Sequence, residues 1–263
     1  MSTQKHILVT GANGQLGMEF RALEKNYPGY RFLFTTREEL PVNDEDAINA
    51  FFVKNVISHC INCAAYTAVD KAETEPEEAF KINAEAVKKL AEACQSHEAL
   101  FIHISTDYVF NGEGSSPYSE TDPTSPVSVY GSSKLKGEAL AREYCEETII
   151  IRTSWVYSRY GKNFVKTMMR LMAEKDSIGV VSDQFGAPTY AADLAEAILQ
   201  IINRFEKPAS GIYHYSNLGL ISWFDFARAI KEISKSNCIV NPIETAAYPT
   251  PAKRPHYSVL DTT

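Results

Sequence analysis

Gly11-Ala12-Asn13-Gly14-Gln15-Leu16-Gly17, near the start of the chain, is the segment from which the fold class follows. It comes directly after a β-branched, apolar segment, 6–10, and opens a segment of helical pattern, 15–24. In such a context the glycines permit a tight turn and close approach of backbone to a pyrophosphate, which then meets the first N–H groups of the helix. The alternative is a glycine-rich turn without a ligand. The strand–turn–helix context favours a dinucleotide-binding loop, whose expected contacts are Gly11, Asn13, Gly14, Gln15, Leu16 and Gly17.

The first half of the chain alternates apolar segments of strand length with segments of helical pattern. The expected strands are 6–10, 31–35, 56–64, 99–105 and 148–152, and the expected helices are 15–24, 44–54, 74–96 and 129–145. Apolar strands separated by helices are typical of a parallel sheet that is covered on both faces. We therefore expect an α/β fold with a Rossmann-type doubly wound parallel sheet, which binds ligands at the carboxyl ends of its strands.

The pattern loosens in the second half. The expected helices are 163–174, 192–204 and 222–234, the expected strand is 211–215, and prolines 242, 249, 251 and 255 predict an irregular tail. We expect a cofactor-binding Rossmann domain over 1–153, to which the chain returns near 190–218. A smaller, interleaved C-terminal lobe, 154–189 and 219–263, would bind the substrate.

Composition excludes several classes of function. The 263 residues can bury a core without disulfides or metals. The net charge is −7, and nothing in the sequence forms the basic face that nucleic acid would require. No apolar segment is long enough to cross a membrane. The five cysteines are odd in number and irregular in spacing, which suggests free thiols in a reducing compartment, the cytoplasm. Cys60 and Cys63 are expected on opposite faces of a strand, and no second pair completes a metal site, so we expect no metal ligands.

Tyr130 and Lys134 stand four apart in a segment of helical pattern, which places both on one face. A tyrosine of pKa about 10 is a poor acid–base group at neutral pH, and a neighbouring cation lowers that pKa. The pair can then exchange a proton with a carbonyl or an alcohol. Thr106, at the carboxyl end of a strand, would offer its hydroxyl to the same oxygen. We predict Thr106, Tyr130 and Lys134 as catalytic residues; the alternative is a tyrosine and a lysine on a solvated helix face.

The end of the second strand bears on the choice of cofactor. An NAD-specific fold usually carries an acidic residue there, whereas this chain has Thr35-Thr36-Arg37. Hydroxyls and a cation suit a 2′-phosphate, so we predict NADPH, with NADH as the alternative. Arg37 has a second interpretation, a solvated residue at a helix start.

Eight segments together resemble the extended short-chain dehydrogenases and, within them, the dTDP-4-dehydrorhamnose reductases. The resemblance covers nearly the whole chain, and the glycine loop and Tyr130-Gly131-Ser132-Ser133-Lys134 mark only the superfamily. The segments more specific to the reductases are NCAAYTAVDKAE (62–73), STDYVF (105–110), RTSWVY (152–157), GKNFV (161–165), DQFGAPT (183–189) and KRP (253–255).

The resemblance implies that NADPH, or NADH, reduces the 4-keto group of dTDP-4-dehydro-6-deoxy-L-mannose to give dTDP-L-rhamnose, a precursor of cell-surface polysaccharide. Tyr130 would donate the proton, Lys134 would tune it and hold the ribose, and Thr106 would polarise the ketone. Further cofactor contacts are expected at Ala64, Ala65 and Tyr66. Expected substrate contacts besides Thr106 are Val69, Asp107, Tyr108 and Trp155, with Arg254 for the diphosphate. Core packing is the alternative for Trp155, and a surface arginine is the alternative for Arg254.

The sequence departs from the family pattern at several positions. Cys63 stands where relatives usually have an alanine-like residue, and Thr36 and Pro41 stand where they often have aspartates beside the adenosine. Some relatives form homodimers through magnesium held by carboxylates, and Glu19 matches one such position. The rest of that site is not recognisable, so magnesium and a homodimer rest on the resemblance alone. The chain stops just after 258–261, where relatives usually continue through a last helix, so we expect a truncated chain.

Two other functions compete with this one. The first is another nucleotide-sugar short-chain dehydrogenase, either a different reductase or a 4-epimerase that retains its NAD. The second is a non-enzymatic regulatory subunit like that of methionine adenosyltransferase, which resembles the reductases in fold. The complete set of Thr106, Tyr130 and Lys134 favours an enzyme, because a regulatory protein has no need to keep all three.

Overall fold

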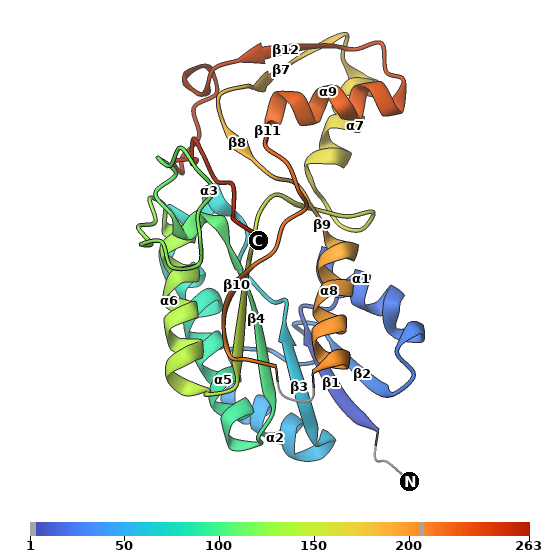
Figure 1. Cartoon of the computed structure of the whole chain (residues 1–263), viewed down its shortest axis with the longest axis vertical. Coiled ribbons are helices and arrows are strands. Elements are labelled where there is room, and N and C mark those ends of the chain that lie inside the picture. The colour runs from blue at the N-terminus through green and yellow to red at the C-terminus, as the bar shows by residue number, and fades with distance from the viewer. Residues whose placement is uncertain (1–3, 206–207) are drawn as a thin grey trace.

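The centre of the molecule is a six-stranded sheet in the order β10-β5-β4-β3-β1-β2, in which every neighbouring pair is parallel (Figure 1). The structure is a computed structural model of the chain, and it describes residues 4–205 and 208–263. The strands are β1 (Lys5–Thr10), β2 (Tyr30–Thr35), β3 (Ile57–Asn62), β4 (Leu100–Thr106), β5 (Thr148–Thr153) and β10 (Gly211–His214). The predicted Rossmann-type α/β fold class is confirmed.

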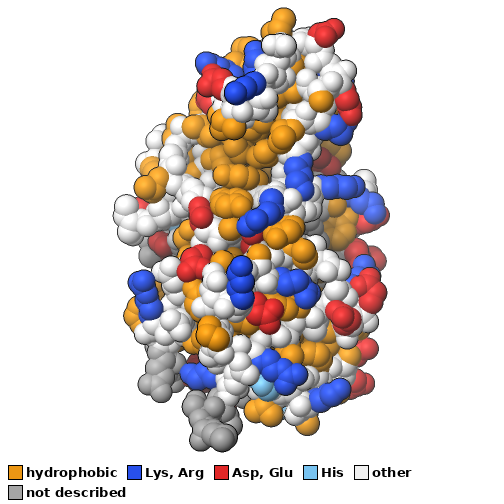
Figure 2. All heavy atoms as spheres, turned by 90° about the vertical axis from the view of Figure 1, so that its right-hand side faces the viewer, with side chains coloured by type: hydrophobic (Ala, Val, Ile, Leu, Met, Phe, Trp, Pro, Cys, Tyr) orange, Lys and Arg blue, Asp and Glu red, His pale blue; other side chains and the backbone are white. Residues whose placement is uncertain are grey.

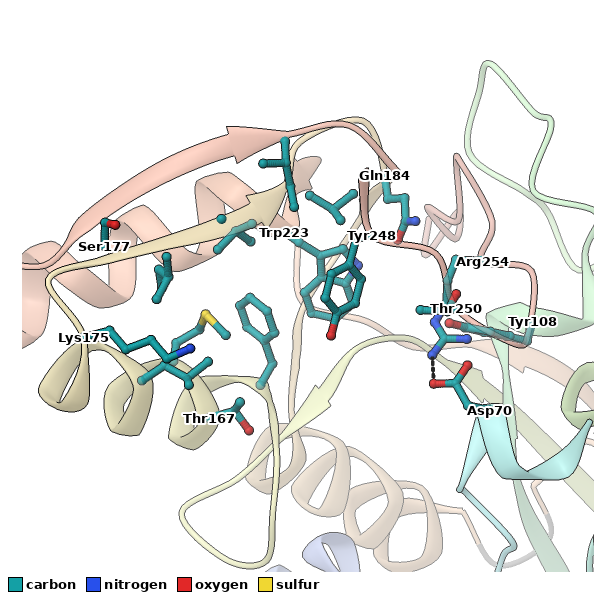
Figure 3. Close-up of a pocket in the computed structure, with 18 residues that line it drawn as sticks. Asp70, Tyr108, Thr167, Lys175, Ser177, Gln184, Trp223, Tyr248, Thr250 and Arg254 are labelled. Carbon is teal, nitrogen blue, oxygen red and sulfur yellow. Dashed lines mark hydrogen bonds and ion pairs between the residues drawn. The ribbon is translucent and has the colours of Figure 1, made fainter. Parts of the chain in front are cut away.

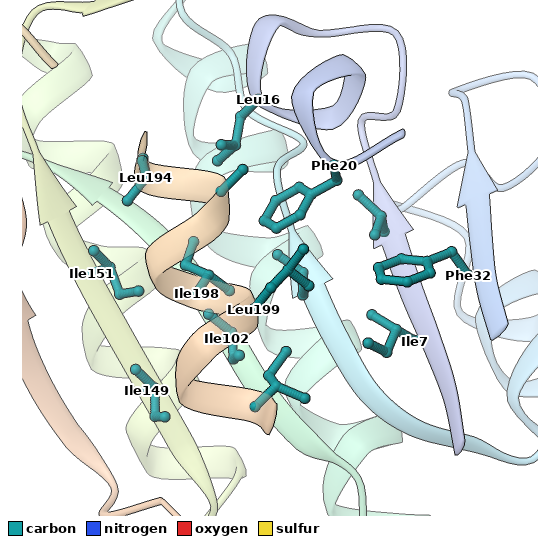
Figure 4. Packing of buried hydrophobic residues seen from close by; sticks show 14 of the residues in the cluster. Ile7, Leu16, Phe20, Phe32, Ile102, Ile149, Ile151, Leu194, Ile198 and Leu199 are labelled. Atoms are coloured by element: carbon teal, nitrogen blue, oxygen red, sulfur yellow. The ribbon is translucent and has the colours of Figure 1, made fainter. Parts of the chain in front are cut away.

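Helices cover both faces of this sheet. One face carries α1 (Gln15–Leu23) and α8 (Ala191–Arg204), which pack on the strands through side chains such as Phe20 and Ile198 (Figure 4). The other face carries α2 (Glu45–Asn55), α5 (Ala86–Ser96) and α6 (Val129–Tyr144). Phe20 and Phe52 are fully buried, one on each face. Burial of such a side chain stabilises the fold by about 1.5–3 kcal/mol, which makes these helices firm supports for the loops above them.

The strand order reverses between β1 and β3, and a ligand crevice is expected at such a point. The loop after β1 and the loop after β3 meet there. Gly11 has a φ of +63°, and a Cβ at this residue would lie 2.7 Å from the nitrogen of Ala64. Only glycine fits both the left-handed backbone and this close approach, which explains the glycine at the first position of the predicted loop.

A smaller group of elements lies beyond the carboxyl ends of the strands (Figure 1). It contains α7 (Phe164–Glu174), β7 (Ser177–Val181), α9 (Trp223–Ser234) and β12 (Ile239–Ile243). β7 pairs in parallel with β12, and an apolar cluster that includes Met168, Ile178 and Ile230 joins them to the helices. Hydrophobic side chains gather towards this end on one side of the molecule (Figure 2). The limits of the predicted substrate lobe stay a prediction.

Two pairs of short strands lie between the two parts. β8 (Phe185–Gly186) pairs antiparallel with β11 (Ile221–Ser222), and β6 (Val156–Tyr157) pairs in parallel with β9 (Thr189–Tyr190). The tail packs back between them, since Tyr257 bridges to Phe185 and Leu260 bridges to Tyr118. Among the helices of the described residues, none combines the length and the apolar character needed to cross a membrane.

Some of the expected elements are wrong in detail. The single helix expected over 74–96 is α4 (Pro76–Phe80), a π-helical turn η2 (Lys81–Glu85) and α5 in succession. The tail is not irregular throughout, because Pro242 lies within β12. A proline is tolerated there because β12 has a strand on one side only in its two-stranded sheet. The strand expected over 56–64 is shorter, since Val56 ends α2 with a left-handed φ of 49°.

The cysteines lie as the strand pattern predicts. Cys60 packs in the cluster beneath α2 and α5, whereas Cys63 packs against the cluster beneath α1 and α8, so the two thiols face opposite sides of the sheet. All five cysteines are free. Within the described residues, no group of three or more His, Cys, Asp or Glu side chains is arranged to hold a metal ion.

Candidate active site

A cavity of about 610 Å³ lies over the carboxyl ends of β1, β2 and β3. Its lining includes seven of the predicted cofactor contacts, namely Gly11, Asn13, Gly14, Arg37, Ala64, Ala65 and Tyr66. Helix α1 begins directly after Gly14, so its unpaired first N–H groups and the positive end of its dipole lie at this cavity. The loop therefore has the chemistry to bind a diphosphate, and the residues present fit a dinucleotide.

The other predicted contacts of the glycine loop lie outside this first cavity. Gln15 and Leu16 line the neighbouring cavity rather than this one. Gly17 lines neither of them; a Cβ there would lie 2.6 Å from Cα of Ala12, so this glycine lets α1 pack closely against the loop.

A second cavity, of about 510 Å³, brings together the predicted catalytic residues. It adjoins the first, because Gly14, Ala64 and Ala65 line both. Thr106 lies at the end of β4, and Tyr130 and Lys134 lie on α6. The predicted substrate contacts that share this cavity are Val69, Thr106, Asp107, Tyr108 and Trp155. A ligand in it would meet the glycine loop and the catalytic residues at once.

Tyr130 holds its proton firmly in this geometry. Burial raises the pKa of Tyr130 to about 12; a hydrogen bond with Thr106 lowers it, and the charge of Asp107 raises it further. The ring of Tyr108 meets the ring of Tyr130 edge-on, with centroids 5.6 Å apart. Tyr130 is therefore a protonated acid at neutral pH, oriented by a threonine on one side and an aromatic ring on another.

Lys134 is buried, and its amine faces the sheet. Its Nζ donates to the carbonyl oxygen of Ile104 at 2.7 Å and lies 3.3 Å from Nε2 of His103. Burial lowers the pKa of Lys134 to about 8, against the opposing effects of Glu138 and Cys63. In this geometry burial dominates the pKa of Tyr130 and the Lys134 amine bonds the carbonyl of Ile104, so the expectation that Lys134 lowers the pKa of Tyr130 stays a prediction.

Asp107 lies immediately behind Thr106. The Thr106 hydroxyl donates to Oδ1 of Asp107 at 2.9 Å and also accepts from the backbone N–H of Tyr108 at 3.2 Å. Burial raises the pKa of Asp107 to about 6, although hydrogen bonds with Ser258 and Thr106 lower it. These bonds fix the direction of the Thr106 side chain at the floor of the cavity.

Trp155 is held in a strained position by packing. It has a left-handed φ of 46°, and such strain in a non-glycine residue is typical of functional sites. Its ring stacks on that of Trp223, with centroids 3.5 Å apart and planes within 8°. No sequence pattern singles out Trp223, which follows the N-cap of α9 and lines the same cavity. Because the two rings cover one face of each other, only an outer face of the stack can serve as a flat apolar wall for a deoxysugar.

A third cavity, of about 590 Å³, opens beside the second (Figure 3). Tyr108 and Trp223 line both cavities, so the two adjoin each other. Tyr248 and Arg254 come to the third cavity from the C-terminal part of the chain. Nη2 of Arg254 lies 2.7 Å from Oδ2 of Asp70, so its planar fork is already engaged by a carboxylate at the rim. The structure thus places Arg254 next to the catalytic cavity rather than inside it.

Arg37 lies at the far end of the first cavity. Its side chain is 78% exposed and 3.8 Å from Glu78, a weak pairing in solvent. Glu38, Glu75 and Glu78 line the same cavity. These carboxylates oppose the attraction of Arg37 for a 2′-phosphate, so a preference for NADPH should be modest.

Asn83 is the supporting residue that sequence reasoning missed most clearly. It lies in the π-helical turn, where its side chain accepts from the N–H of Tyr66 at 2.8 Å and donates to the carbonyl of Tyr66 at 3.0 Å. It also donates to the hydroxyl of Ser133 on α6 at 3.0 Å. Asn83 therefore ties the cofactor loop to the catalytic helix. An asparagine within a helical pattern is the one available signal, because asparagine disfavours helix interiors.

Glu19, which matches a magnesium position of some relatives, is buried in a protein contact. Its Oε1 accepts from the hydroxyl of Ser158 at 2.7 Å, and its Oε2 lies 3.7 Å from Arg159. This carboxylate joins α1 to the loop after β6. Magnesium and a homodimer stay predictions from resemblance.

Comparison with known proteins agrees with this geometry. Residues 5–263 match the family model described as the RmlD substrate binding domain. The dTDP-4-dehydrorhamnose reductase of Aggregatibacter actinomycetemcomitans is 44% identical over 98% of this chain and 90% of that protein. The crystal structure of dTDP-4-dehydrorhamnose reductase from Bacillus anthracis str. Ames in complex with NADP matches with a TM-score of 0.95 and 38% identity, over 99% of this chain and 92% of that one. A UDP-glucose 4-epimerase of Thermus thermophilus in complex with NAD is 21% identical, with a TM-score of 0.81 over 97% of this chain and 90% of that one, and shares the fold alone.

Proposed function

As this chain belongs to the dTDP-4-dehydrorhamnose reductase family, we propose that it reduces the 4-keto group of dTDP-4-dehydro-6-deoxy-L-mannose and forms dTDP-L-rhamnose. NADPH supplies the hydride to sugar C4, as the NADP in the related structure suggests. The observation that carries the proposal is the convergence of Thr106, Tyr130 and Lys134 with the glycine loop on one cavity.

Tyr130 acts as the proton donor in this proposal. When hydride reaches C4, the carbonyl oxygen gains negative charge and takes the phenolic proton of Tyr130, which leaves a phenolate. The Thr106 hydroxyl, which donates its single proton to Asp107 in this geometry, would turn that proton towards the same oxygen to stabilise it. Lys134 then stabilises the phenolate and returns a proton to it.

The remaining cavities are assigned to the ends of the two ligands. The cavity beside Arg37 would hold the adenosine of the cofactor, and the one beside Arg254 would hold the dTDP group. An outer face of the Trp155–Trp223 stack would lie against the hexose, whose apolar C6 methyl group matches an indole surface. We place the reaction in the cytoplasm, which the five free cysteines support.

The test is a cofactor-oxidation assay with a panel of 4-keto nucleotide sugars. We expect turnover of dTDP-4-dehydro-6-deoxy-L-mannose with stoichiometric oxidation of NADPH. Absence of turnover for every dTDP-4-keto sugar would contradict the assignment. Purified protein that retains NAD and interconverts C4 epimers without net oxidation would identify the epimerase instead, and co-purification with a synthetase would identify the regulatory subunit.

Arg37→Ala should weaken NADPH more than NADH. The 2′-phosphate is the group that distinguishes NADPH from NADH, and its contact with an exposed guanidinium changes affinity by about fivefold. The measurement is the Kd of both cofactors, followed by protein fluorescence. Arg170→Ala is the control, because Arg170 is also exposed and paired with a glutamate but lies on α7 away from the first cavity. Equal losses for both cofactors would remove Arg37 from the 2′-phosphate site.

Arg254→Ala should raise the KM for the nucleotide sugar and leave NADPH affinity alone. A charge-assisted contact contributes about 1.5–3 kcal/mol, so KM should rise by at least about tenfold. Steady-state kinetics with the sugar at saturating NADPH measures this. Lys253→Ala is the matched control, because the neighbouring amine is exposed and 3.7 Å from Glu113. An unchanged KM in Arg254→Ala would exclude Arg254 from diphosphate binding.

A further inference from the structure

A chain of buried polar groups crosses the sheet beneath Lys134. The hydroxyl of Thr10 on β1 donates to Oδ1 of Asn62 on β3 at 2.6 Å. Nδ2 of Asn62 lies 3.1 Å from Nδ1 of His103 on β4, and Nε2 of His103 lies 3.3 Å from Nζ of Lys134. His103 has no exposed surface, and none of the proposed catalytic steps uses it.

The orientation of the Asn62 amide is fixed by its other neighbours. The backbone N–H of Ala64 donates to Oδ1 of Asn62 at 3.2 Å. If the amide were turned over, its NH₂ group would face this N–H, and two donors would meet. The oxygen of Asn62 therefore faces Ala64, and its NH₂ group faces the imidazole of His103.

This orientation selects one tautomer of His103. Because Asn62 donates to Nδ1, that nitrogen carries no proton, and the proton of the neutral ring lies on Nε2. Burial lowers the pKa of His103 well below its usual value, and the charge of Lys134 lowers it further, so the ring stays neutral. Nε2–H consequently points at the amine of Lys134.

An ammonium group has three donors and no acceptor, whereas a neutral amine has a lone pair. The contact between Nε2 and Nζ is a hydrogen bond only when Lys134 is neutral, since two donors would otherwise face each other. We propose that His103, held in one tautomer by Asn62, is a positioning residue. It favours the neutral amine of Lys134 over the ammonium and so makes the ammonium readier to give its proton to Tyr130.

The other groups around the Lys134 amine either favour its ammonium form or carry no charge. Glu138, one helical turn along α6, favours the ammonium, but its carboxylate is already paired with Arg152. Cys63 follows β3 and, like Glu138, favours the ammonium, although burial raises the pKa of its thiol. Tyr130 on α6 is protonated. His103 is therefore the polar neighbour that, together with burial, makes the loss of a proton from Lys134 easier.

The effect of His103 on Lys134 matters for the reaction cycle, so this role of His103 rests on the proposed function. After Tyr130 has given its proton to the sugar, the phenolate must be protonated again. A general acid works best when its pKa lies near the working pH, and burial already lowers the pKa of Lys134 to about 8. An ammonium that His103 disfavours passes its proton to the phenolate readily.

The direct test is NMR of the full-length protein without substrate. Nitrogen-15 shifts of the histidine rings report the tautomer, and we expect His103 to carry its proton on Nε2. Protein labelled with ¹³C at lysine Cε gives the titration of Lys134, whose resonance is identified by its loss in Lys134→Arg. Two variants then change the partner of the amine. His103→Gln offers a carbonyl oxygen to the ammonium, and Asn62→Ala frees the ring to take the other tautomer.

Both variants should move the titration of Lys134 upward by about one pH unit. The pH above which kcat declines should rise with it. His59→Gln is the matched control, because His59 is a buried histidine on β3 whose ring contacts Ser58 and Tyr30. This control should leave the titration of Lys134 unchanged.

A proton on Nδ1 of His103 in the parent, or an unchanged titration of Lys134 in His103→Gln, would overturn the proposal. The tautomer measurement needs no variant, so it holds even if His103→Gln fails to fold. These readings are independent of turnover. A shifted lysine in a protein that reduces no 4-keto sugar would support the effect of His103 on Lys134 and reject the proposed function instead.

Discussion

Tyr130→Phe is expected to lower kcat by about 100- to 10,000-fold while leaving NADPH affinity nearly unchanged. The substitution removes the transferable proton and keeps the ring that packs edge-on against Tyr108. Steady-state kinetics gives kcat, and a fluorescence titration gives the Kd for NADPH. Tyr30→Phe is the control, because the Tyr30 hydroxyl only donates to the carbonyl of Ile202 at 3.2 Å, on the α8 side of the sheet.

Near wild-type activity in Tyr130→Phe would exclude Tyr130 as the acid. A parallel loss of NADPH affinity would show instead that the hydroxyl is needed to shape the cofactor site. The direction of the proposed reaction fits the electrostatics, because a reductase needs a tyrosine that holds its proton before hydride transfer. Burial, which raises the pKa of Tyr130 to about 12, provides that state.

Much of the fold could be predicted because its signals are local. The glycine loop needs a left-handed backbone at Gly11, and the apolar strands of the central sheet stand out from the helices between them. β7 and β12 were missed because they are short and amphipathic and pair only with each other. The π-helical turn was missed because the helical pattern continues through it; Asn83, within this turn, bonds Tyr66 on another segment.

Residues of the candidate site could likewise be predicted only where the sequence signal is local. Thr106, Tyr130 and Lys134 could be selected because their spacing and their place after a strand carry chemical meaning. Trp223 and His103 could not, since each gains its role from a neighbour on another element. The direction of the Lys134 amine could not be predicted from the sequence either, because it depends on the carbonyl of Ile104 and on the depth of burial.

A buried ion pair links α6, the helix that carries Tyr130 and Lys134, to β5, the strand next to β4. Glu138 follows Tyr130 and Lys134 on α6, and its carboxylate accepts from Nε and Nη2 of Arg152 on β5 at 2.9 and 2.7 Å. Both side chains are 3% exposed. The hydroxyl of Ser105, the residue before Thr106, donates to the same carboxylate at 2.5 Å. The distance between the proton donor and the strand end of β4 thus depends on Glu138.

Glu138→Ala should lower the free energy of unfolding by about 3–5 kcal/mol, because it leaves the guanidinium of Arg152 buried without a partner. A domain is stable by only about 5–15 kcal/mol, so this loss is large. Urea unfolding measures it. Replacing both partners by methionine should cost less than Glu138→Ala alone, since neither charge is then buried. The exposed pair of Arg170 and Glu174 provides the control, where Glu174→Ala should change stability by less than about 1 kcal/mol. If Glu138→Ala were as mild as this control, the pair could not be what holds α6 against the sheet.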